Sequence, residues 1–481
     1  MTLSRELFQV LTWLIPLIHL LGLSLVFDAI WNGRSAQGST AWIVGLVAFP
    51  YLAIPLYLIF GRGHFHGYIR ARQSHDAQLK QAASTLLSSS QKLGFLSPDG
   101  EKLPAFRVLE HLARLPFTRG HKADLLIDGE ATFSALFAAC EKAEHYILIQ
   151  FFIARDDAIG CALSAILERK AAAGVRVYYL YDEIGSHATS SQYWKNLQKA
   201  GAATAPFNSR RGGWRNRFQL NFRNHRKITV IDGLTAFVGG HNLGDDYLGK
   251  GPIGPWRDTH VQVEGPSVAA LQLSFLEDWY WARGEVIAVK EEPKAVPSGD
   301  LWALALPTGP ADRVDVCSLM FCELIQAAEK RLWIASPYFV PDVQVLSQLK
   351  LAALRGVDVR IILPEQPDHL LPYLAAYSYI EAVESLGVRF YRLTTAFPHQ
   401  KVVLIDSDGV AVGSANLDNR SLYLNFEVTM LFAGRSLAEA TERMLTKDMD
   451  ASRLVARGEL QEKSWFFRLG VRAARLLAPI L

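Results

Sequence analysis

Cysteine and charge are both scarce in this chain of 481 residues. The four cysteines, Cys140, Cys161, Cys317 and Cys322, are too few and too scattered for a disulfide framework or a cysteine-based zinc site. Free thiols in a reducing compartment are the simplest expectation. Charged residues make up 20% of the chain and hydrophobic residues 50%, which excludes a disordered protein or a fibre. The net charge of +3 also excludes a polycation that binds nucleic acid through bulk charge.

Charge is missing above all from the first 60 residues, where segments 7–27 and 41–60 contain no charged side chain. Each segment is long enough for the roughly 20 residues with which a helix spans a membrane. Arg62, Arg70 and Arg72 follow the second segment, whereas the loop between the segments is nearly uncharged. Because cytoplasmic loops are rich in basic residues, we expect a transmembrane hairpin with both ends, and the large body, in the cytoplasm.

The body is predicted to contain the same fold twice. Strand, helix and strand patterns occur in the same order at residues 146–153, 158–173 and 175–181 and again at 332–336, 343–355 and 357–363. Gly174 and Gly356 end the two helical patterns at matching places. A repeat of this length indicates a duplicated α/β domain rather than a solenoid unit.

Composition divides the chain further. A stretch rich in charge, proline and glycine at 289–299 indicates a linker between the copies. The expected organisation is a membrane segment at 1–72, a connecting segment at 73–125, a first domain at 126–288, a second domain at 300–455 and a C-terminal amphipathic segment at 456–481.

Each copy contains one polar pattern, His-x-Lys followed by four residues and Asp. It comprises His225, Lys227 and Asp232 in the first copy and His399, Lys401 and Asp406 in the second. A strand that ends in small residues and an asparagine follows, with Gly240 and Asn242 in the first copy and Ser414 and Asn416 in the second. The same pattern at matching places of a repeat carries a low risk of coincidence.

These residue types suit the chemistry of a phosphate ester. Histidine and lysine two apart on an extended segment lie on one face, where lysine supplies positive charge for a phosphoryl oxygen. The aspartates are placed to hold turns through backbone hydrogen bonds. Gly240 and Ser414 are small enough for an anion to approach the backbone, and Asn242 and Asn416 add neutral donors, so these four are expected to bind the substrate phosphate.

If the copies pack with their motifs facing each other, one site has two histidines, two lysines and no evident metal ligand. One imidazole would attack phosphorus and the other would protonate the leaving alkoxide, without a metal or cofactor. An imidazole in this role needs an acceptor on its far nitrogen. Asp258 and Glu427 lie 33 and 28 residues after the histidines of their own copies, each at the start of a strand-like run that could return beside the motif.

Longer stretches around the motifs carry a family resemblance. Gly-Gly-His-Asn-Leu-Gly-Asp-Asp-Tyr at 239–247, Pro-Trp-Arg-Asp-Thr-His at 255–260 and Gly-Ser-Ala-Asn-Leu-Asp-Asn-Arg-Ser-Leu at 413–422 resemble bacterial cardiolipin synthases of the phospholipase D superfamily. The resemblance implies two phospholipase D-like α/β domains after a transmembrane helical hairpin in the bacterial inner membrane. It also implies that the two His-Lys-Asp sets are catalytic, and we expect His225 to be the nucleophile.

The implied reaction transfers a phosphatidyl group from one phosphatidylglycerol to another through a phosphatidyl-histidine intermediate, giving cardiolipin and glycerol. A phospholipase D-type hydrolase, another phosphatidyltransferase, a membrane-tethered nuclease and a non-enzymatic scaffold are the alternatives. Basic and aromatic residues interleave at 210–227, which suits anionic lipid or single-stranded nucleic acid. The predicted hairpin favours anionic phospholipids as partners and no nucleic acid. Arginines at 468, 472 and 475 predict an interfacial amphipathic helix, with docking on the core as the alternative.

Overall fold

The computed structural model describes residues 2–61, 65, 67–69, 84, 104–207, 221–289, 296 and 299–481. Most of the connecting segment at 73–125, most of the linker at 289–299 and residues 208–220 of the basic stretch therefore lie outside the described residues, as do Arg62 and Arg70 to Arg72. The chain forms two compact units, one of residues 1–70 with 209–223 and one of residues 71–208 with 224–481.

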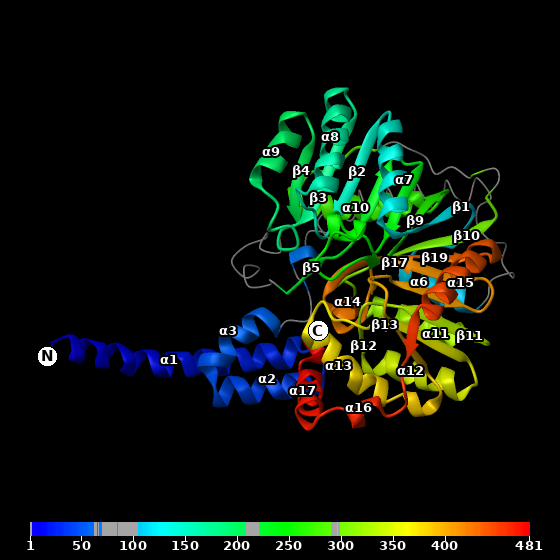
Figure 1. The fold of residues 1–481 in the computed structure, drawn as a ribbon. Helices are drawn as coiled ribbons and strands as arrows, with labels where there is room; N and C mark the ends of the chain where they lie inside the picture. The colour runs from blue at the N-terminus through cyan, green and yellow to red at the C-terminus, as the bar shows by residue number, and fades with distance from the viewer. Residues whose placement is uncertain are drawn as a thin grey trace. The chain divides into compact units, whose positions relative to one another are not determined.

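The first unit consists of three helices, α1 (Thr2–Asn32), α2 (Ala36–Ala48) and α3 (Pro50–Phe60) (Figure 1). Gly22 lets α1 approach α2, because a Cβ atom there would lie only 2.6 Å from the carbonyl oxygen of Leu46. The hydroxyl of Tyr57 on α3 donates a hydrogen bond of 2.8 Å to Asp28 near the end of α1. The three helices thus fold onto one another.

The structure divides the second predicted span into two helices. Phe49 leaves the helical conformation, with φ −136° and ψ 55°, directly before Pro50, which has no N–H to continue the ladder. At about 1.5 Å per residue, the 11 residues of α3 rise about 17 Å, short of a bilayer core. Among the described residues, only the part of α1 from Thr12 to Asn32 is long and apolar enough to cross a membrane.

The second unit is built on one continuous sheet that contains both copies. Its order is β20-β14-β13-β11-β16-β17-β19-β10-β1-β9-β7-β6-β2-β3-β4, so the two copies meet where β1 pairs with β10. The first copy supplies β1 (Thr118–Ile127), β2 (Tyr146–Phe151), β3 (Arg176–Asp182), β4 (Ala203–Phe207), β6 (Ile228–Ile231), β7 (Thr235–Gly239) and β9 (Thr259–Glu264). The second supplies β10 (Leu301–Thr308), β11 (Arg331–Ala335), β13 (Asp358–Pro364), β14 (Arg389–Leu393), β16 (Val402–Ile405), β17 (Gly409–Gly413), β19 (Asn425–Ala433) and β20 (Ser452–Leu454).

Within each copy three strands are parallel and the rest are antiparallel. β2, β3 and β4 are parallel in the first copy, as are β11, β13 and β14 in the second. Five short strands complete the set, namely β5 (Arg223–Asn224), β8 (Trp256–Arg257), β12 (Phe339–Val340), β15 (Phe397–Pro398) and β18 (Leu417–Asp418). The strand order repeats from one copy to the other, which confirms the predicted duplication and the α/β class.

Helices cover the sheet in both copies (Figure 1). They are α6 (Pro104–Ala113), α7 (Asp128–Lys142), α8 (Ala158–Ala172), α9 (Ser191–Lys199), α10 (Val268–Arg283), α11 (Val316–Ala327), α12 (Val343–Leu354), α13 (Leu370–Glu381), α14 (Asn419–Tyr423), α15 (Arg435–Asp450), α16 (Glu459–Glu462) and α17 (Trp465–Leu476), with short 3-10 turns at Asp245–Leu248, Glu384–Leu386 and Ala478–Ile480. Gly174 and Gly356 follow α8 and α12 with φ of 93° and 86°, a conformation that favours glycine and ends both helices as predicted.

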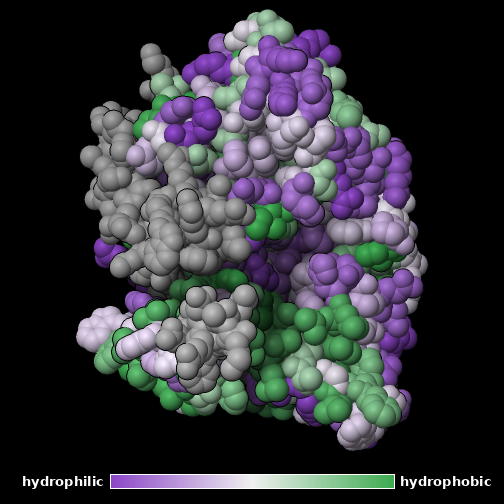
Figure 2. All heavy atoms as spheres, turned by 90° about the vertical axis from the view of Figure 1, so that its left-hand side faces the viewer, coloured by the Kyte–Doolittle hydropathy of each residue, from purple (hydrophilic) through white to green (hydrophobic). Residues whose placement is uncertain are grey.

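The C-terminal helix α17 has one buried face and other faces that expose apolar side chains. Val471 and Ala474 are buried, Val471 in a cluster with Tyr377 of α13, so the helix docks on the body. Phe466 and Leu476 on other faces remain about 80% exposed. Figure 2 shows hydrophobic side chains gathered over the lower part of the face that it draws.

Candidate active site

The two histidines of the repeated motif are each fixed to the opposite copy. The backbone N–H of His225, which follows β5, donates to the carbonyl oxygen of Phe426 at 2.9 Å. The N–H of His399, which follows β15, donates to the carbonyl oxygen of Arg257 at 2.7 Å. Both side chains are buried, and each histidine leads into a fully buried central strand, β6 or β16.

Histidines and carboxylates pair crosswise. Nδ1 of His225 lies 3.0 Å from both carboxylate oxygens of Glu427, and Nδ1 of His399 lies 2.7 Å from Oδ2 of Asp258. The sequence interpretation associated each acid with the histidine of its own copy, which is wrong. Each acid directly follows the residue whose carbonyl holds the histidine of the other copy. The pairing leaves Nε2 of both rings for a substrate.

The lysines reach the same site from a loop rather than from a strand. Lys227 Nζ donates to the carbonyl oxygen of His225 at 2.6 Å, and Lys401 Nζ donates to that of His399. Residues 225–227 precede β6, so the amines turn back along their own motif instead of sharing a strand face. Burial lowers the pKa of Lys227 well below its ordinary value, and the charge of Lys401 adds to that effect, so the two amines lie within electrostatic reach of each other.

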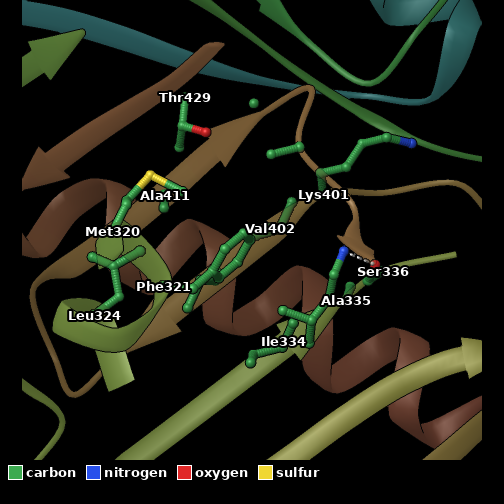
Figure 3. A pocket seen from close by; sticks show the side chains of 14 residues that line it. Met320, Phe321, Leu324, Ile334, Ala335, Ser336, Lys401, Val402, Ala411 and Thr429 are labelled. Carbon is green, nitrogen blue, oxygen red and sulfur yellow. Dashed lines mark hydrogen bonds between the residues drawn. The ribbon is translucent and has the colours of Figure 1, made fainter. Parts of the chain in front are cut away.

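Figure 3 shows a pocket of about 320 Å³ of empty space beside Lys401. Apolar side chains such as Met320, Phe321 and Leu324 line it, and the amine of Lys401 points away from them. The pocket is therefore a gap in the core behind the lysine, and the polar site lies on the other side.

Burial and neighbouring cations keep both imidazoles neutral. Burial lowers the pKa of His225 to about 4, with Glu427 opposing the shift and Lys227 adding to it. Burial, Lys401 and Lys227 hold the pKa of His399 well below its ordinary value. Burial also lowers the pKa of Lys401 to about 8. Positive charge is thus concentrated around neutral imidazoles, which favours binding of an anion.

The two acids differ in their tendency to ionise. Burial by itself acts to raise the pKa of both carboxyl groups. For Glu427 the charges of His225 and Lys227 and a hydrogen bond from Ser414 outweigh burial, and the pKa is lowered. For Asp258 burial outweighs the nearby positive charges, and the pKa is raised. The site is therefore not electrostatically symmetric, and Glu427 ionises more readily than Asp258.

Gly240 and Ser414 support these acids, and this corrects their predicted contact with phosphate. A Cβ atom at Gly240 would lie 2.1 Å from Oδ1 of Asp258, so the carboxylate occupies the space that the glycine leaves. At the matching position, the hydroxyl of Ser414 donates to Oε2 of Glu427 at 2.6 Å. The small residues admit or hold the acids rather than a ligand.

The two asparagines have different surroundings. Nδ2 of Asn242 donates to the hydroxyl of Tyr247 at 2.9 Å, and its Oδ1 accepts from the N–H of Ile153 at 3.1 Å. One N–H of Nδ2 and the oxygen are thus used within the protein, and the predicted phosphate contact through the second N–H stays a prediction. Nδ2 of Asn416 makes only a long contact of 3.4 Å to Asp418, which leaves a phosphate contact open to this residue.

The motif aspartates lie at the far end of their strands from the histidines. Asp232 accepts hydrogen bonds of 2.7–2.8 Å from the N–H groups of residues 144–146, and Asp406 accepts bonds of 2.8–3.0 Å from those of residues 329–331. Four residues of extended chain lie between each aspartate and its lysine, a span of about 17 Å. Through these bonds the aspartates hold the turns before β2 and β11, and this geometry favours a positioning role over the predicted catalytic one.

Sequence reasoning missed a second pair of acids beneath the motifs. Asp278 on α10 accepts from Arg226 at 2.9 Å, and Asp448 on α15 accepts from Gln400 at 3.1 Å, so each holds the middle residue of one motif. They lie 53 and 49 residues after the motif histidines. That near-constant offset in the repeat is the signal that could have found them.

Aromatic rings that no motif indicates also enclose the histidines. Phe152 lies edge-on to His225 with ring centroids 4.9 Å apart, and Trp256 lies 5.1 Å from His399. The hydroxyl of Tyr247 is 3.4 Å from Nδ1 of His399. In the part of the chain that the structure describes, no group of three or more His, Cys, Asp or Glu residues is arranged to hold a metal ion.

Comparison with known proteins agrees with this geometry. The family model described as "Cardiolipin synthase, PLD-like domain" matches residues 136–266 and 321–449, together more than half of the chain. Cardiolipin synthase A of Pseudomonas putida (strain GB-1) is 46% identical over 471 residues, which is 98% of both chains. The chain belongs to the cardiolipin synthase family of the phospholipase D superfamily.

Other relatives agree with this placement. Cardiolipin synthase A of Pseudomonas fluorescens (strain SBW25) is 47% identical over 476 residues, covering 98% of this chain and 99% of that protein. The crystal structure of phosphatidylserine synthase from Haemophilus influenzae Rd KW20 covers 79% of this chain and 100% of its own, with a TM-score of 0.59 and 16% identity. That likeness shows a shared fold.

Replacing Glu427 with Gln tests the crosswise pairing. We expect kcat to fall by about 10²–10⁴-fold, because a neutral amide orients the imidazole without stabilising its charged form. The pKa of His225 should fall further, because Glu427 raises it, while that of His399 changes little. Histidine-selective NMR titration measures both pKa values. Glu439→Gln, on the exposed side of α15, is the control, and a pKa change at His399 alone would contradict the pairing.

The pH dependence of kcat/KM follows from the same charges. His225 has a pKa lowered to about 4, so it is a neutral nucleophile above that pH and is lost to protonation as the pH falls through 4. Lys401 has a pKa lowered to about 8, so its positive charge is lost as the pH rises through 8. Steady-state rates across this range should show a plateau between the two limits. A rate still rising above pH 9 would contradict the role of Lys401.

Asp406→Ala tests the positioning role. Loss of the acceptor of three N–H groups, at a residue with φ of 47°, should lower the free energy of unfolding by about 2–4 kcal/mol. Asp408→Ala in the same turn is the control. Because Asp406 lies far from the histidines, folded Asp406→Asn protein should retain kcat within about threefold of wild type. Chemical denaturation and turnover at low temperature measure both, and a stable but inactive Asp406→Asn protein would restore the catalytic assignment.

Proposed function

We propose that this enzyme transfers a phosphatidyl group from one phosphatidylglycerol to another, giving cardiolipin and glycerol. The observation that carries the proposal is one buried site with two lysines and two histidines, each histidine held at Nδ1 by a carboxylate. Family membership supports the choice of lipid substrates. The copies at 126–288 and 300–455 act as halves of one catalytic unit, since each supplies the carboxylate for the other's histidine.

His225 is the proposed nucleophile. The ionised Glu427 stabilises positive charge on its ring, whereas the raised pKa of Asp258 gives His399 a weaker counter-charge. Nε2 of His225 attacks the phosphorus of the first phosphatidylglycerol, and the bond from phosphorus to the glycerol oxygen breaks. His399 delivers a proton to that oxygen, so glycerol leaves and a phosphatidyl-histidine remains.

The second step reverses these roles. His399, now neutral, takes the proton from a glycerol hydroxyl of the second phosphatidylglycerol. That oxygen attacks phosphorus and the bond to Nε2 of His225 breaks, which releases cardiolipin. Lys227 and Lys401 offset charge on the phosphoryl oxygens in both steps. An anionic phosphodiester between the lysines also raises the pKa of His399, so a bound substrate supplies the condition for its protonation.

Membrane attachment supports lipid substrates. The apolar helix α1 anchors the protein, and α2 and α3 together form the second part of a multi-pass segment in the bacterial inner membrane. Arg62, Arg70 and Arg72 favour the cytoplasmic side for the body. The exposed Phe466 and Leu476 of α17 suit contact with the same bilayer.

Purified protein in phosphatidylglycerol vesicles, with the lipid labelled in its head-group glycerol, tests the reaction. We expect cardiolipin and free glycerol in equal amounts, and a drop of at least 10³-fold in His225→Ala and His399→Ala proteins. With lipid labelled instead in its acyl chains, denaturation at alkaline pH, where a phosphorus–nitrogen bond to histidine survives, should trap label on wild-type protein and none on the His225→Ala protein. Phosphatidate as the main product would instead indicate a hydrolase, and cleavage of an added oligonucleotide would indicate a nuclease.

A further inference from the structure

A buried arginine outside the two motifs has an unused hydrogen-bonding edge. Arg392 on β14 is 1% exposed, and its guanidinium lies over the rings of Tyr373 and Tyr377, at 4.9 and 4.6 Å from their centroids. Nη1 donates to the carbonyl oxygen of Pro364 at 2.9 Å. Nε and Nη2 have no hydrogen-bond partner, and no carboxylate among the described residues forms an ion pair with this arginine.

These contacts define what Arg392 lacks. The two tyrosines stabilise the cation through its faces, and one carbonyl satisfies one of its nitrogens. Nε and Nη2 share the remaining edge, which is the edge that binds two oxygens of a phosphate or carboxylate. A buried cation is costly when it has no anionic partner, so this edge suits an oxyanion that none of the described residues supplies.

Arg392 lines a hollow of about 270 Å³ of empty space. The other polar and aromatic residues that line it are Tyr338, Asp368, His369 and Tyr373. The hollow lies at the carboxyl ends of the parallel strands β11, β13 and β14, where ligands bind in open α/β sheets.

A chain of contacts links the hollow to Lys401. Ser336 lies with Lys401 around the pocket of Figure 3, and its hydroxyl donates to the carbonyl oxygen of Tyr338 at 2.9 Å. The hydroxyl of Tyr338 donates to Asp368 at 2.5 Å. The charge of Asp368 reaches the catalytic group, since it raises the pKa of Lys401. Asp368 itself is occupied by Tyr338 and by the N–H of His369 at 2.7 Å.

The first copy has no equivalent of this arginine. Leu363 pairs with Arg392 between β13 and β14, and the matching pair between β3 and β4 is Tyr181 with Pro206. Pro206 is exposed and carries no charge. Among the described residues, this arginine therefore has no counterpart in the other copy, whereas the histidines and lysines occur in both.

We propose that Arg392 anchors the unreacted phosphate of the acceptor lipid. The inference rests on the proposed function, in which two lipids that each carry a phosphate must meet at one catalytic site. The acceptor's glycerol oxygen forms the new bond to phosphorus as the bond to His225 breaks, and its proton passes to His399. The acceptor's own phosphate takes no part in bond making, so it needs a separate cation, which Arg392 supplies.

A one-lipid reaction separates this role from catalysis. With free glycerol as acceptor, the phosphatidyl-enzyme exchanges labelled glycerol into phosphatidylglycerol, and no second phosphate is involved. We expect Arg392→Gln to lower the ratio of cardiolipin formation to glycerol exchange by about 10–100-fold, mainly through the KM of the acceptor. Arg392→Lys should recover part of the ratio, since lysine keeps the positive charge but lacks the paired N–H donors of the guanidinium.

Arg389→Gln is the matched control, because Arg389 lies on the same strand with an exposed side chain paired to Asp358. Equal loss of both reactions in Arg392→Gln, with none in Arg389→Gln, would mean that the arginine only supports the fold. An unchanged ratio would likewise overturn the proposal. Wild-type protein that exchanges glycerol but forms no cardiolipin would refute the proposed function itself, independently of the variants.

Glycerol 3-phosphate and inorganic phosphate identify the source of the oxyanion. If the site selects a lipid head group, neither compound at millimolar concentration should inhibit wild-type cardiolipin formation by more than about twofold. Inhibition that is competitive with phosphatidylglycerol in wild type and absent in Arg392→Gln would assign the site to a free phosphate ester and overturn the acceptor-lipid assignment.

Discussion

The crosswise pairing of histidine and carboxylate is the constraint on which the rest of the body depends. Glu427 serves His225 and Asp258 serves His399, so neither copy contains a complete site. Two backbone hydrogen bonds fix this exchange, because each histidine N–H donates to the residue that directly precedes the partner acid. The copies must therefore hold a fixed register, and the junction of β1 with β10 makes their sheets continuous.

Charge explains why this register matters. Lys227 and Lys401 are both buried. Two buried ammonium groups repel each other, and nearby anions are needed to offset the energetic cost. Glu427 and Asp258 supply two negative charges, which raise the pKa of both lysines against the effect of burial. A substrate phosphate adds the next negative charge at the point where the lysines converge. The acids thus orient the imidazoles and also stabilise the buried positive charge of the lysines.

The sequence contained the motifs, the duplication and the helix ends at Gly174 and Gly356, because these depend on local spacing and periodicity. It did not contain the crosswise pairing, since the same spacing fits either arrangement and the partners are 202 and 141 residues apart. Gly240 and Ser414 suggested room for an anion, and the room exists, but a neighbouring acid fills it. The break at Phe49–Pro50 shows the reverse case, in which one local residue overrides a long apolar run.

Duplication gives a site with two histidines, two lysines and two carboxylates. The proposed transfer between a donor and an acceptor needs the two halves of that site to differ. The differences lie at matched positions of the repeat. Ser414 donates a hydrogen bond to Glu427, and this bond adds to the stronger effects of His225 and Lys227 that lower the pKa of Glu427 against burial. Gly240 only makes room for Asp258, whose pKa burial raises. Arg392 extends the same asymmetry beyond the motifs, since its counterpart is the uncharged Pro206. These departures from symmetry, more than the repeated residues, are the basis for the proposed assignment of His225 as the nucleophile.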